Sequence, residues 1–183
     1  IWIGDWSTET DSQILVPYEG KRLEPFTEYP VVVKAIDDKG EAAEAATAFE
    51  TGRMGTPWKA QWITDGEYHF TEKKISPKTM TFRKKIACNG KIKKARLYAT
   101  ALGIYELALN GEKVGDIYFA PGFTSYKHQL QYQTYDVTEQ LKSKEAGENE
   151  LVAVVGGGWA VGSFTYKRVN RNYADRQALL CEL

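Results

Sequence analysis

The sequence lacks an excess of charge of either sign, and it lacks long apolar runs. Its 24 Lys and Arg residues balance 24 Asp and Glu residues, which gives a formal net charge of zero. Nucleic acids and anionic membranes select for a strongly basic face, so this balance argues against both as partners. The longest apolar runs, such as residues 151–155, are far shorter than the roughly 18 residues that a membrane-spanning helix needs.

Cysteine is scarce. Cys88 and Cys181 are the two cysteines of the chain, too few for a disulfide framework. They also lack the C-x-x-C type of spacing found in zinc sites. We expect two buried or half-buried thiols, with a single disulfide as the alternative, and neither outcome identifies the redox compartment.

An N-terminal Met is missing as well. No basic segment followed by an apolar segment stands at the N-terminus, so no secretory signal is visible there. We therefore expect that Ile1 is not the start of a natural gene product and that the 183 residues are a piece of a longer protein.

Patterns that would carry catalysis are also missing. His69 and His128 lack a metal-type partner at i+4, and no Lys-Ser/Thr pair follows the three glycines at 156–158 to make a phosphate-binding loop. The acidic pairs at 37–38 and at 148 and 150 stand in expected turns, where carboxylates ordinarily face solvent. We predict no catalytic residue in this chain.

What the sequence does contain is a series of short strand-like segments separated by Gly, Pro, Asn and Asp, which is typical of an all-β sandwich or barrel. Asn110-Gly111 is the strongest hairpin signal, because a type I′ turn needs positive φ at both central residues. Residues 41–48 stay open to three interpretations: a short helix by propensity, a polar loop, or an edge strand. Strands are expected at 13–16, 29–36, 46–51, 79–86, 92–101, 104–109, 113–119, 131–135, 149–155 and 178–183.

A linker is indicated at residues 52–57, which hold two glycines and a proline after an expected strand. We therefore predict two domains, residues 1–53 and residues 54–183. The three or four strands of the first domain are too few to close a sandwich of about seven, so we expect the C-terminal part of a sandwich that is cut within the domain. The second domain has enough strands for a sandwich that lacks only its last strand or strands.

Aromatic residues gather in the expected loops of the second domain, among polar side chains. Sugars bind by stacking their C–H faces on aromatic rings while Asn, Asp and Arg hydrogen-bond to hydroxyls, so the mixture is suited to carbohydrate. The alternative is that the tyrosines, especially Tyr132 and Tyr135, are core and edge packing. The aromatic residues are Tyr126, Tyr132, Tyr135, Trp159, Phe164, Tyr166 and Tyr173, and the polar ones are Asn170, Arg171, Asn172, Asp175 and Arg176.

Several motifs, in order along the chain, resemble the N-terminal β-sandwich module of bacterial α-L-rhamnosidases. The motifs are WKAQWI (58–63), FRK (82–84), ARLYATALGIYEL (95–107), LNGEKVGD (109–116), APGFTSY (120–126), YQTYDVT (132–138) and GGGW (156–159) with Gly162. The preceding segments VPYEGKRL (16–23), TEY (27–29) and AFETG (48–52) resemble the second half of a fibronectin-type-III-like domain.

The resemblance implies a partial immunoglobulin/fibronectin-III-like sandwich followed by a jelly-roll, galactose-binding-like β-sandwich. It implies a parent enzyme that is an inverting glycoside hydrolase releasing terminal α-L-rhamnose, with the chemistry in an (α/α)6 barrel further along the polypeptide. This fragment is then expected to recognise substrate or to support the barrel. Its implied partners are a rhamnose-containing glycan or glycoside and the missing catalytic domains of the same chain, with no nucleic acid and no membrane.

The predicted sugar-binding residues are Trp159, Asn170, Arg171, Asn172, Tyr173 and Asp175. The resemblance also brings in calcium, which assists rhamnose binding in some relatives and takes six to eight oxygen ligands. Asn170, Asn172 and Asp175 are the candidate calcium ligands. Two alternative functions stay open: a scaffold that binds no sugar, and an extracellular adhesion module. For the location of the parent protein, a periplasmic or secreted one is favoured over a cytoplasmic one.

Overall fold

The computed structural model describes residues 1–12, 14–65, 77–88, 90–141, 147–163 and 166–183. The chain divides into two compact units, Ile1–Pro57 and Trp58–Leu183, a few residues after the boundary expected from the sequence. Among the described residues the regular structure is β-strand apart from the short helix α1 (Gly158–Val161), which confirms the all-β fold class. None of the described helical structure is long and apolar enough to cross a membrane.

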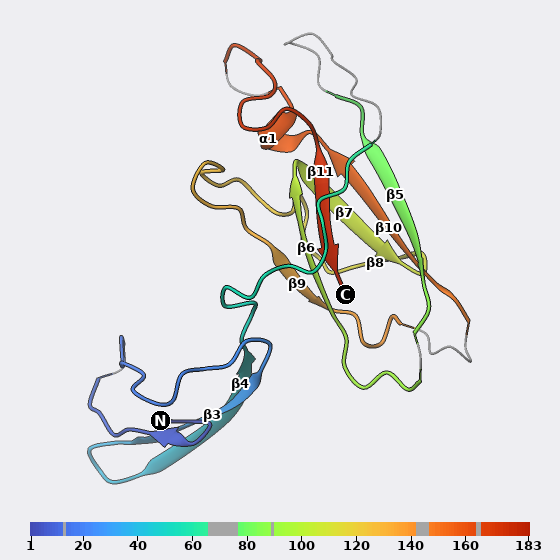
Figure 1. Cartoon of the computed structure of the whole chain (residues 1–183). Coiled ribbons are helices and arrows are strands. Elements are labelled where there is room, and N and C mark those ends of the chain that lie inside the picture. The colour runs from blue at the N-terminus through green and yellow to red at the C-terminus, as the bar shows by residue number, and fades with distance from the viewer. Residues whose placement is uncertain (13, 66–76, 89, 142–146, 164–165) are drawn as a thin grey trace. The chain divides into compact units, whose positions relative to one another are not determined.

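The first unit is an antiparallel sheet with the strand order β2-β1-β3-β4 (Figure 1). Its strands are β1 (Trp2–Ile3), β2 (Trp6–Ser7), β3 (Glu28–Ile36) and β4 (Ala42–Glu50). β3 and β4 pair along their whole length, and the Asp37 carboxylate closes their connection by accepting hydrogen bonds from the backbone N–H groups of Lys39 (2.9 Å) and Glu41 (2.8 Å). Among the described strands β4 pairs only with β3, so residues 41–48 lie almost entirely in an edge strand, one of the three interpretations left open.

The second unit has two antiparallel sheets that form the layers of a sandwich (Figure 1). One sheet has the order β5-β10-β7-β8, and the other has the order β11-β6-β9. The strands are β5 (Met80–Ile86), β6 (Arg96–Leu102), β7 (Ile104–Leu109), β8 (Glu112–Lys113), β9 (Gln133–Asp136), β10 (Asn149–Gly156) and β11 (Ala178–Glu182).

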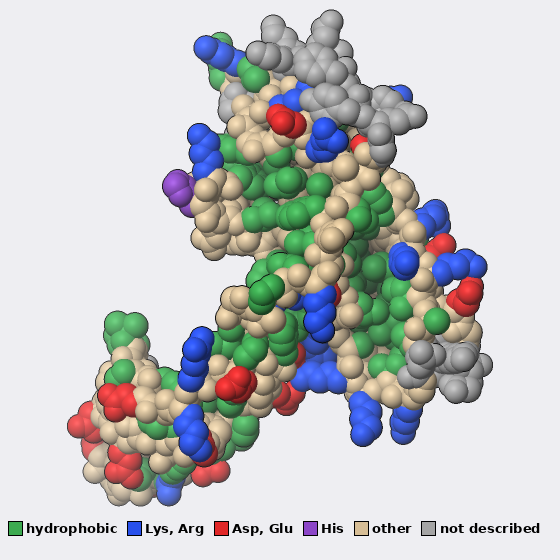
Figure 2. Space-filling view, in the orientation of Figure 1, with side chains coloured by type: hydrophobic (Ala, Val, Ile, Leu, Met, Phe, Trp, Pro, Cys, Tyr) green, Lys and Arg blue, Asp and Glu red, His purple; other side chains and the backbone are tan. Residues whose placement is uncertain are grey.

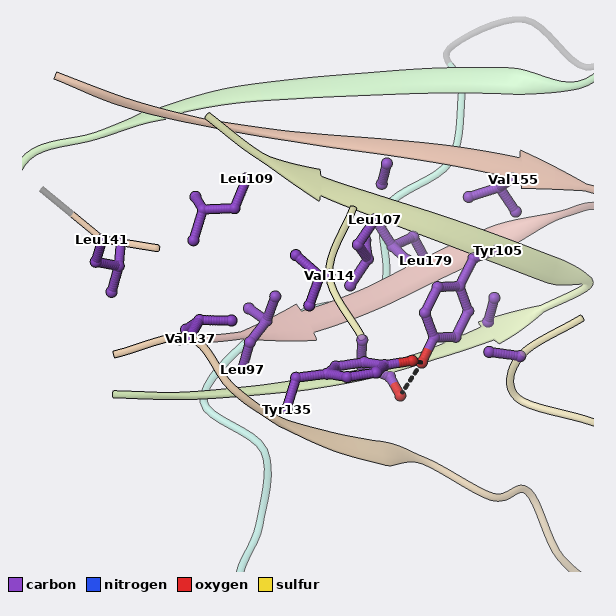
Figure 3. Packing of buried hydrophobic residues seen from close by; sticks show 14 residues of the cluster. Leu97, Tyr105, Leu107, Leu109, Val114, Tyr135, Val137, Leu141, Val155 and Leu179 are labelled. Atoms are coloured by element: carbon purple, nitrogen blue, oxygen red, sulfur yellow. Dashed lines mark hydrogen bonds between the residues drawn. The ribbon is translucent and has the colours of Figure 1, made fainter. Parts of the chain in front are cut away.

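A hydrophobic core fills the space between these two sheets (Figure 3). On β7, Tyr105, Leu107 and Leu109 are buried while Glu106 is exposed, which is the period-two alternation of a strand with one face on the core. β10 lies between β5 and β7, the central position that its apolar sequence predicts. The buried members of the cluster are Leu97, Ala99, Ala101, Tyr105, Leu107, Leu109, Val114, Ala120, Tyr135, Val137, Leu141, Ala153, Val155 and Leu179.

The turn between β7 and β8 confirms the Asn110-Gly111 prediction. Both residues have positive φ, 55° and 85°, as a type I′ turn requires. The returning strand is shorter than expected, because β8 ends at Lys113 rather than at Phe119. Gly115 has a φ of 70°, and its backbone lies so close to the Tyr135 ring that a Cβ would come within 2.6 Å of it, so the chain turns away from the sheet here.

The strand expected at 13–16 is wrong over the residues that the structure describes. Gln13 lies outside them, and residues 14–16 form no strand. Leu15 has a φ of 53°, and the Ser12 hydroxyl donates a hydrogen bond to the Ile14 carbonyl oxygen at 2.7 Å. A short polar side chain that bonds to nearby backbone offers the chain an alternative to sheet pairing.

Both cysteines are free thiols and half-buried, as expected. Burial raises the pKa of the Cys181 thiol to about 12. At neutral pH Cys181 is therefore protonated, and it packs against the core as a small apolar side chain.

Candidate functional site

The segment between α1 and β11 carries most of the predicted site residues, and it folds back onto α1. The N–H of Arg171 donates to the Val161 carbonyl at 2.8 Å, and the N–H groups of residues 173 and 174 donate to the Ala160 carbonyl at 3.1 and 3.2 Å. Carbonyls at the end of a helix lack partners within the helix, so the loop satisfies them. This arrangement brings Trp159, on α1, into the same region as residues 170–175.

Five aromatic rings meet in this region, and we call them the aromatic cluster: Phe119, Phe123, Tyr126, Trp159 and Tyr173. The ring centroid of Phe123 lies 5.9 Å from that of Tyr126 and 6.2 Å from that of Trp159. It also lies 6.4 Å from Tyr173, and Phe119 lies 6.3 Å from Trp159. The separations and the edge-to-face angles of these pairs are those that aromatic rings prefer. The cluster joins the loop before β9 to α1 and to the loop before β11.

The rings of the aromatic cluster differ in their exposure. Phe119 is 63% exposed, Phe123 is 54% exposed and Tyr173 is 39% exposed. Trp159 and Tyr126 are half-buried behind them, and burial raises the pKa of the Tyr126 hydroxyl. Figure 2 shows hydrophobic side chains gathered over α1 and the loop before β9. The exposed part of the cluster is therefore formed by the two phenylalanines and Tyr173, and Trp159 is half-buried against the phenylalanines.

A buried polar network holds the loop of Phe119 and Phe123 to the core. The Tyr105 N–H donates to the Ala120 carbonyl at 2.7 Å, and the Gln133 side-chain amide donates to the Pro121 carbonyl at 3.2 Å. The Tyr105 hydroxyl is 2.8 Å from Gln133 Oε1 and 3.1 Å from the Tyr135 hydroxyl (Figure 3). Burial raises the pKa of Tyr105 well above its ordinary value, so its hydroxyl remains a donor at neutral pH. The aromatic loop is thus anchored to the sandwich.

The predicted polar residues are less available than the aromatic ones. Asn170 is only 3% exposed, and its side-chain oxygen accepts a hydrogen bond from Arg171 Nη1 at 3.3 Å. Arg171 Nε donates to the Asp175 carbonyl at 3.1 Å, and Asn172 Nδ2 donates to the Val169 carbonyl at 2.8 Å. These bonds stabilise the loop itself. Asn172 and Asp175 are exposed, whereas Asn170 is withdrawn from any surface ligand.

The hydrogen bonds within this loop also affect whether its residues can bind calcium. The cation needs carboxylate or carbonyl oxygens from several directions. Here the Arg171 guanidinium donates a hydrogen bond to Asn170 Oδ1. The bond occupies an oxygen that could bind calcium, and it places a positive charge beside it. This contact argues against Asn170 as a calcium ligand in this arrangement, and calcium binding by Asn170, Asn172 and Asp175 stays a prediction.

Other aromatic residues of the predicted set lie elsewhere. Tyr132 packs against Trp58 at 5.8 Å and Tyr98 at 6.2 Å, and Tyr135 belongs to the core, so both are packing residues. Tyr166 is fully exposed. Phe164 and His69 lie outside the described residues.

Sequence reasoning missed Phe119 and Phe123. Phe119 stood at the end of the strand expected at 113–119, and it was not among the predicted sugar-binding residues. A signal was present nonetheless, because the two phenylalanines flank Pro121-Gly122, a turn-forming pair that opens a loop rich in aromatics.

The two antiparallel sheets with a hydrophobic core between them define the second unit as a β-sandwich module. Residues 90–183 match the model of the α-L-rhamnosidase N-terminal domain. The chain belongs to this family. Residues 5–55, in the first unit, match the model of the Rha78A-like N-terminal immunoglobulin domain.

Individual relatives agree with the family match. An α-L-rhamnosidase of Formosa agariphila is 34% identical over 179 residues, which cover 87% of this chain and 18% of that protein. An α-L-rhamnosidase of Streptomyces avermitilis is 47% identical over 93 residues, 51% of this chain and 9% of that protein. The crystal structure of the Aspergillus terreus α-L-rhamnosidase has a TM-score of 0.83 at 30% identity and covers 95% of this chain and 20% of that one. The chain thus spans about a fifth of the length of such relatives, or less.

Proposed function

We propose that the chain is the non-catalytic N-terminal part of an α-L-rhamnosidase that releases terminal α-L-rhamnose. Family membership supports this, and so does the small share of the relatives that the chain spans. In this proposal the acid and base carboxylates lie in another part of the parent protein. The chain by itself then shows no turnover of an aryl rhamnoside.

We further propose that the second unit recognises a rhamnose-containing glycan through the aromatic cluster. The observation that carries this proposal is the exposure of Phe119, Phe123 and Tyr173 within one aromatic cluster, together with the hydrogen bonds that hold the loop of the two phenylalanines to the core. An exposed apolar patch of aromatic rings marks an interaction site. L-Rhamnose is a 6-deoxy sugar, so its methyl group and C–H faces match such a surface.

Calorimetric titration of the 183-residue chain with L-rhamnose and with a rhamnose-terminated oligosaccharide tests the proposal. Phe123→Ala removes the ring that contacts three other members of the cluster, and we expect affinity to fall about tenfold. Phe49→Ala is the matched control, since Phe49 is 36% exposed but lies in the first unit, and we expect it to leave affinity unchanged. Absence of binding by the unsubstituted chain contradicts the proposal.

A scaffold role is the second candidate, and one observation favours it. Ile117 is 47% exposed and Tyr118 is 67% exposed, so the apolar surface extends along the chain beyond Phe119. Exposed apolar side chains of this kind also fit burial against another domain of the parent. If the scaffold role holds, Ile117→Asp in the intact parent lowers the thermal midpoint and leaves rhamnose affinity unchanged. If the recognition role holds, Phe123→Ala lowers rhamnose affinity and leaves the thermal midpoint unchanged.

A further inference from the structure

Strand β4 of the first unit (Figure 1) has the features of a strand that pairs with a further strand. It is nine residues long, against about five or six in most strands, and every residue except Glu50 is exposed. Among the described strands it pairs only with β3, in one unbroken register and so without a bulge. It contains no Pro and no Lys. Bulges, prolines and lysines are common means by which an edge strand avoids pairing with another chain, and β4 has none of them.

The free side of β4 presents a row of backbone groups. The N–H of Asp37 donates to the Glu41 carbonyl at 3.0 Å, and the N–H of Thr51 donates to the Thr27 carbonyl at 2.9 Å. Both pairs continue the register of β3 and β4, and hydrogen-bonded pairs alternate with non-hydrogen-bonded ones along an antiparallel ladder. The odd-numbered residues of β4 therefore bond to β3. The even-numbered residues of the range 42–48 point their N–H and C=O groups to the free edge.

The order of side chains on β4 makes this edge complementary to a second copy of itself. When two copies run antiparallel about Ala46, the even-numbered residues of one copy meet those of the other and can complete a ladder. In this register every side chain larger than alanine lies opposite an alanine, and no carboxylate faces another. Like charges directly opposite each other destabilise a sheet. The opposed residues are Glu44 and Ala48, Thr47 and Ala45, Phe49 and Ala43, and Glu50 and Ala42.

We propose that two copies of the chain associate through β4, in an antiparallel pair centred on Ala46, so that their four-stranded sheets become one continuous sheet. Moving the centre to Thr47 places Glu44 opposite Glu50. Moving it to Ala45 leaves the last two residues of β4 beyond the strand of the other copy. The proposal goes beyond the proposed function, which concerns the second unit. A dimer carries two second units and therefore two aromatic clusters.

The net charge of the first unit sets how salt affects this association. The unit holds 5 basic and 11 acidic residues, a net charge of −6, so two first units repel each other. Salt screens this repulsion, and we expect the dimer to be tighter in 500 mM than in 50 mM NaCl. Association between the acidic first unit of one copy and the basic second unit of another would have the opposite salt dependence.

Sedimentation equilibrium of the 183-residue chain over the micromolar range tests the proposal, and we expect a monomer–dimer equilibrium in 500 mM NaCl. Ala46→Pro removes an N–H at the centre of the pair. It leaves the bonds to β3 intact, because this N–H points to the free edge, where a sheet tolerates proline. We expect the dissociation constant of the dimer to rise about tenfold or more, with an unchanged circular dichroism spectrum.

A pair of charge variants tests the register and does not depend on proline. Ala46→Lys places two ammonium groups opposite each other, and Ala46→Glu places two carboxylates there, so each variant alone should remain monomeric. An equimolar mixture should form a heterodimer, because an ammonium then lies opposite a carboxylate. Ala35→Lys is the matched control, since it adds the same charge at an exposed position of β3, which lies between β1 and β4. We expect it to dimerise as the unsubstituted chain does.

A chain that stays monomeric over the whole concentration range overturns the proposal. A dimer that Ala46→Pro leaves equally tight also overturns it, because another surface then joins the copies. So does a dimer that weakens with salt and that the Lys and Glu variants form separately, since that result indicates pairing of unlike units. Recovery of the dimer only in the mixture supports β4 pairing centred on Ala46.

Discussion

The first unit pairs four strands in one sheet, whereas the second pairs seven strands in two sheets, and the second sheet changes how much apolar surface is buried. In the second unit two sheets face each other, and every buried member of the hydrophobic cluster lies there. In the first unit a single sheet leaves β4 exposed along nearly its whole length, and Ile36 on β3 is 66% exposed. Since apolar burial is the main stabilising contribution in folding, the second unit has a core of its own and the first has little of one.

The units also differ in charge. The first unit holds 5 basic and 11 acidic residues, a net charge of −6, and the second holds 19 basic and 13 acidic residues, a net charge of +6. A net charge of zero for the chain is therefore the sum of two opposite fields. Partner classes are better inferred for each unit separately, because a ligand senses only the charges within a Debye length or so.

The largest difference between the units is expected on truncating a leucine. Leu97 on β6 is 1% exposed, and Leu97→Ala should cost about 3 kcal/mol of unfolding free energy through lost burial and the cavity left behind. Leu15 in the first unit is 95% exposed, and Leu15→Ala should change stability by less than about 0.5 kcal/mol. Urea unfolding followed by circular dichroism measures both, and equal effects would show that the first unit has a core that burial does not reveal.

A smaller effect is expected for the buried network beneath the aromatic loop. Tyr105→Phe keeps the ring but removes the hydroxyl that donates to the Ala99 carbonyl (3.1 Å) and contacts Gln133, at a cost of about 1–2 kcal/mol. Tyr118→Phe is the control, since Tyr118 is largely exposed. Urea midpoints measure the cost. An unchanged midpoint for Tyr105→Phe would mean that water replaces the network.

The same network makes the second unit sensitive to high pH. Burial raises the pKa of Tyr105 and Tyr135 in the folded state above the unfolded value of about 10. The folded state thus holds these protons more tightly, so their contribution is fully present below pH 10 and is lost as pH rises further. Thermal midpoints between pH 8 and 11 should fall above about pH 10, and Tyr105→Phe should make the fall shallower. A flat profile contradicts the burial of these hydroxyls.

The sequence predicts the strands well where local chemistry decides. Asn110-Gly111 marks its own turn, β10 is apolar enough to be central, and the alternation on β7 identifies its buried face. The sequence predicts poorly where tertiary contacts decide. β8 ends at Lys113, and two residues later Gly115 has a φ of 70° and lies against Tyr135, which is distant in sequence.

The candidate site shows the same limit. Sequence composition indicated aromatic and polar loops, but it placed Trp159 and Asn170 among the predicted sugar-binding residues and left out Phe119 and Phe123. Trp159 is half-buried behind Phe119 and Phe123, and Asn170 is buried against Arg171. Which ring of a cluster faces solvent depends on how two loops pack, and no single segment encodes that.

The smallest effect is expected for exposed ion pairs, one in each unit. Lys21 pairs with Asp5 in the first unit, and Lys85 pairs with Glu148 at 2.7 Å in the second, with all four side chains largely exposed. The hydrogen bond with Lys21 lowers the pKa of the Asp5 carboxyl, and the hydrogen bond with Glu148 raises the pKa of the Lys85 ammonium. Solvent screens the attraction in both pairs, and ordering two side chains opposes it. Lys21→Gln and Lys85→Gln should therefore leave the urea midpoint unchanged in 50 and 500 mM NaCl. A fall in the urea midpoint of Lys85→Gln alone, at 50 mM but not at 500 mM NaCl, would mean that ion pairs between β5 and the segment before β10 stabilise the second unit. The units would then differ in electrostatic stabilisation as well as in apolar burial.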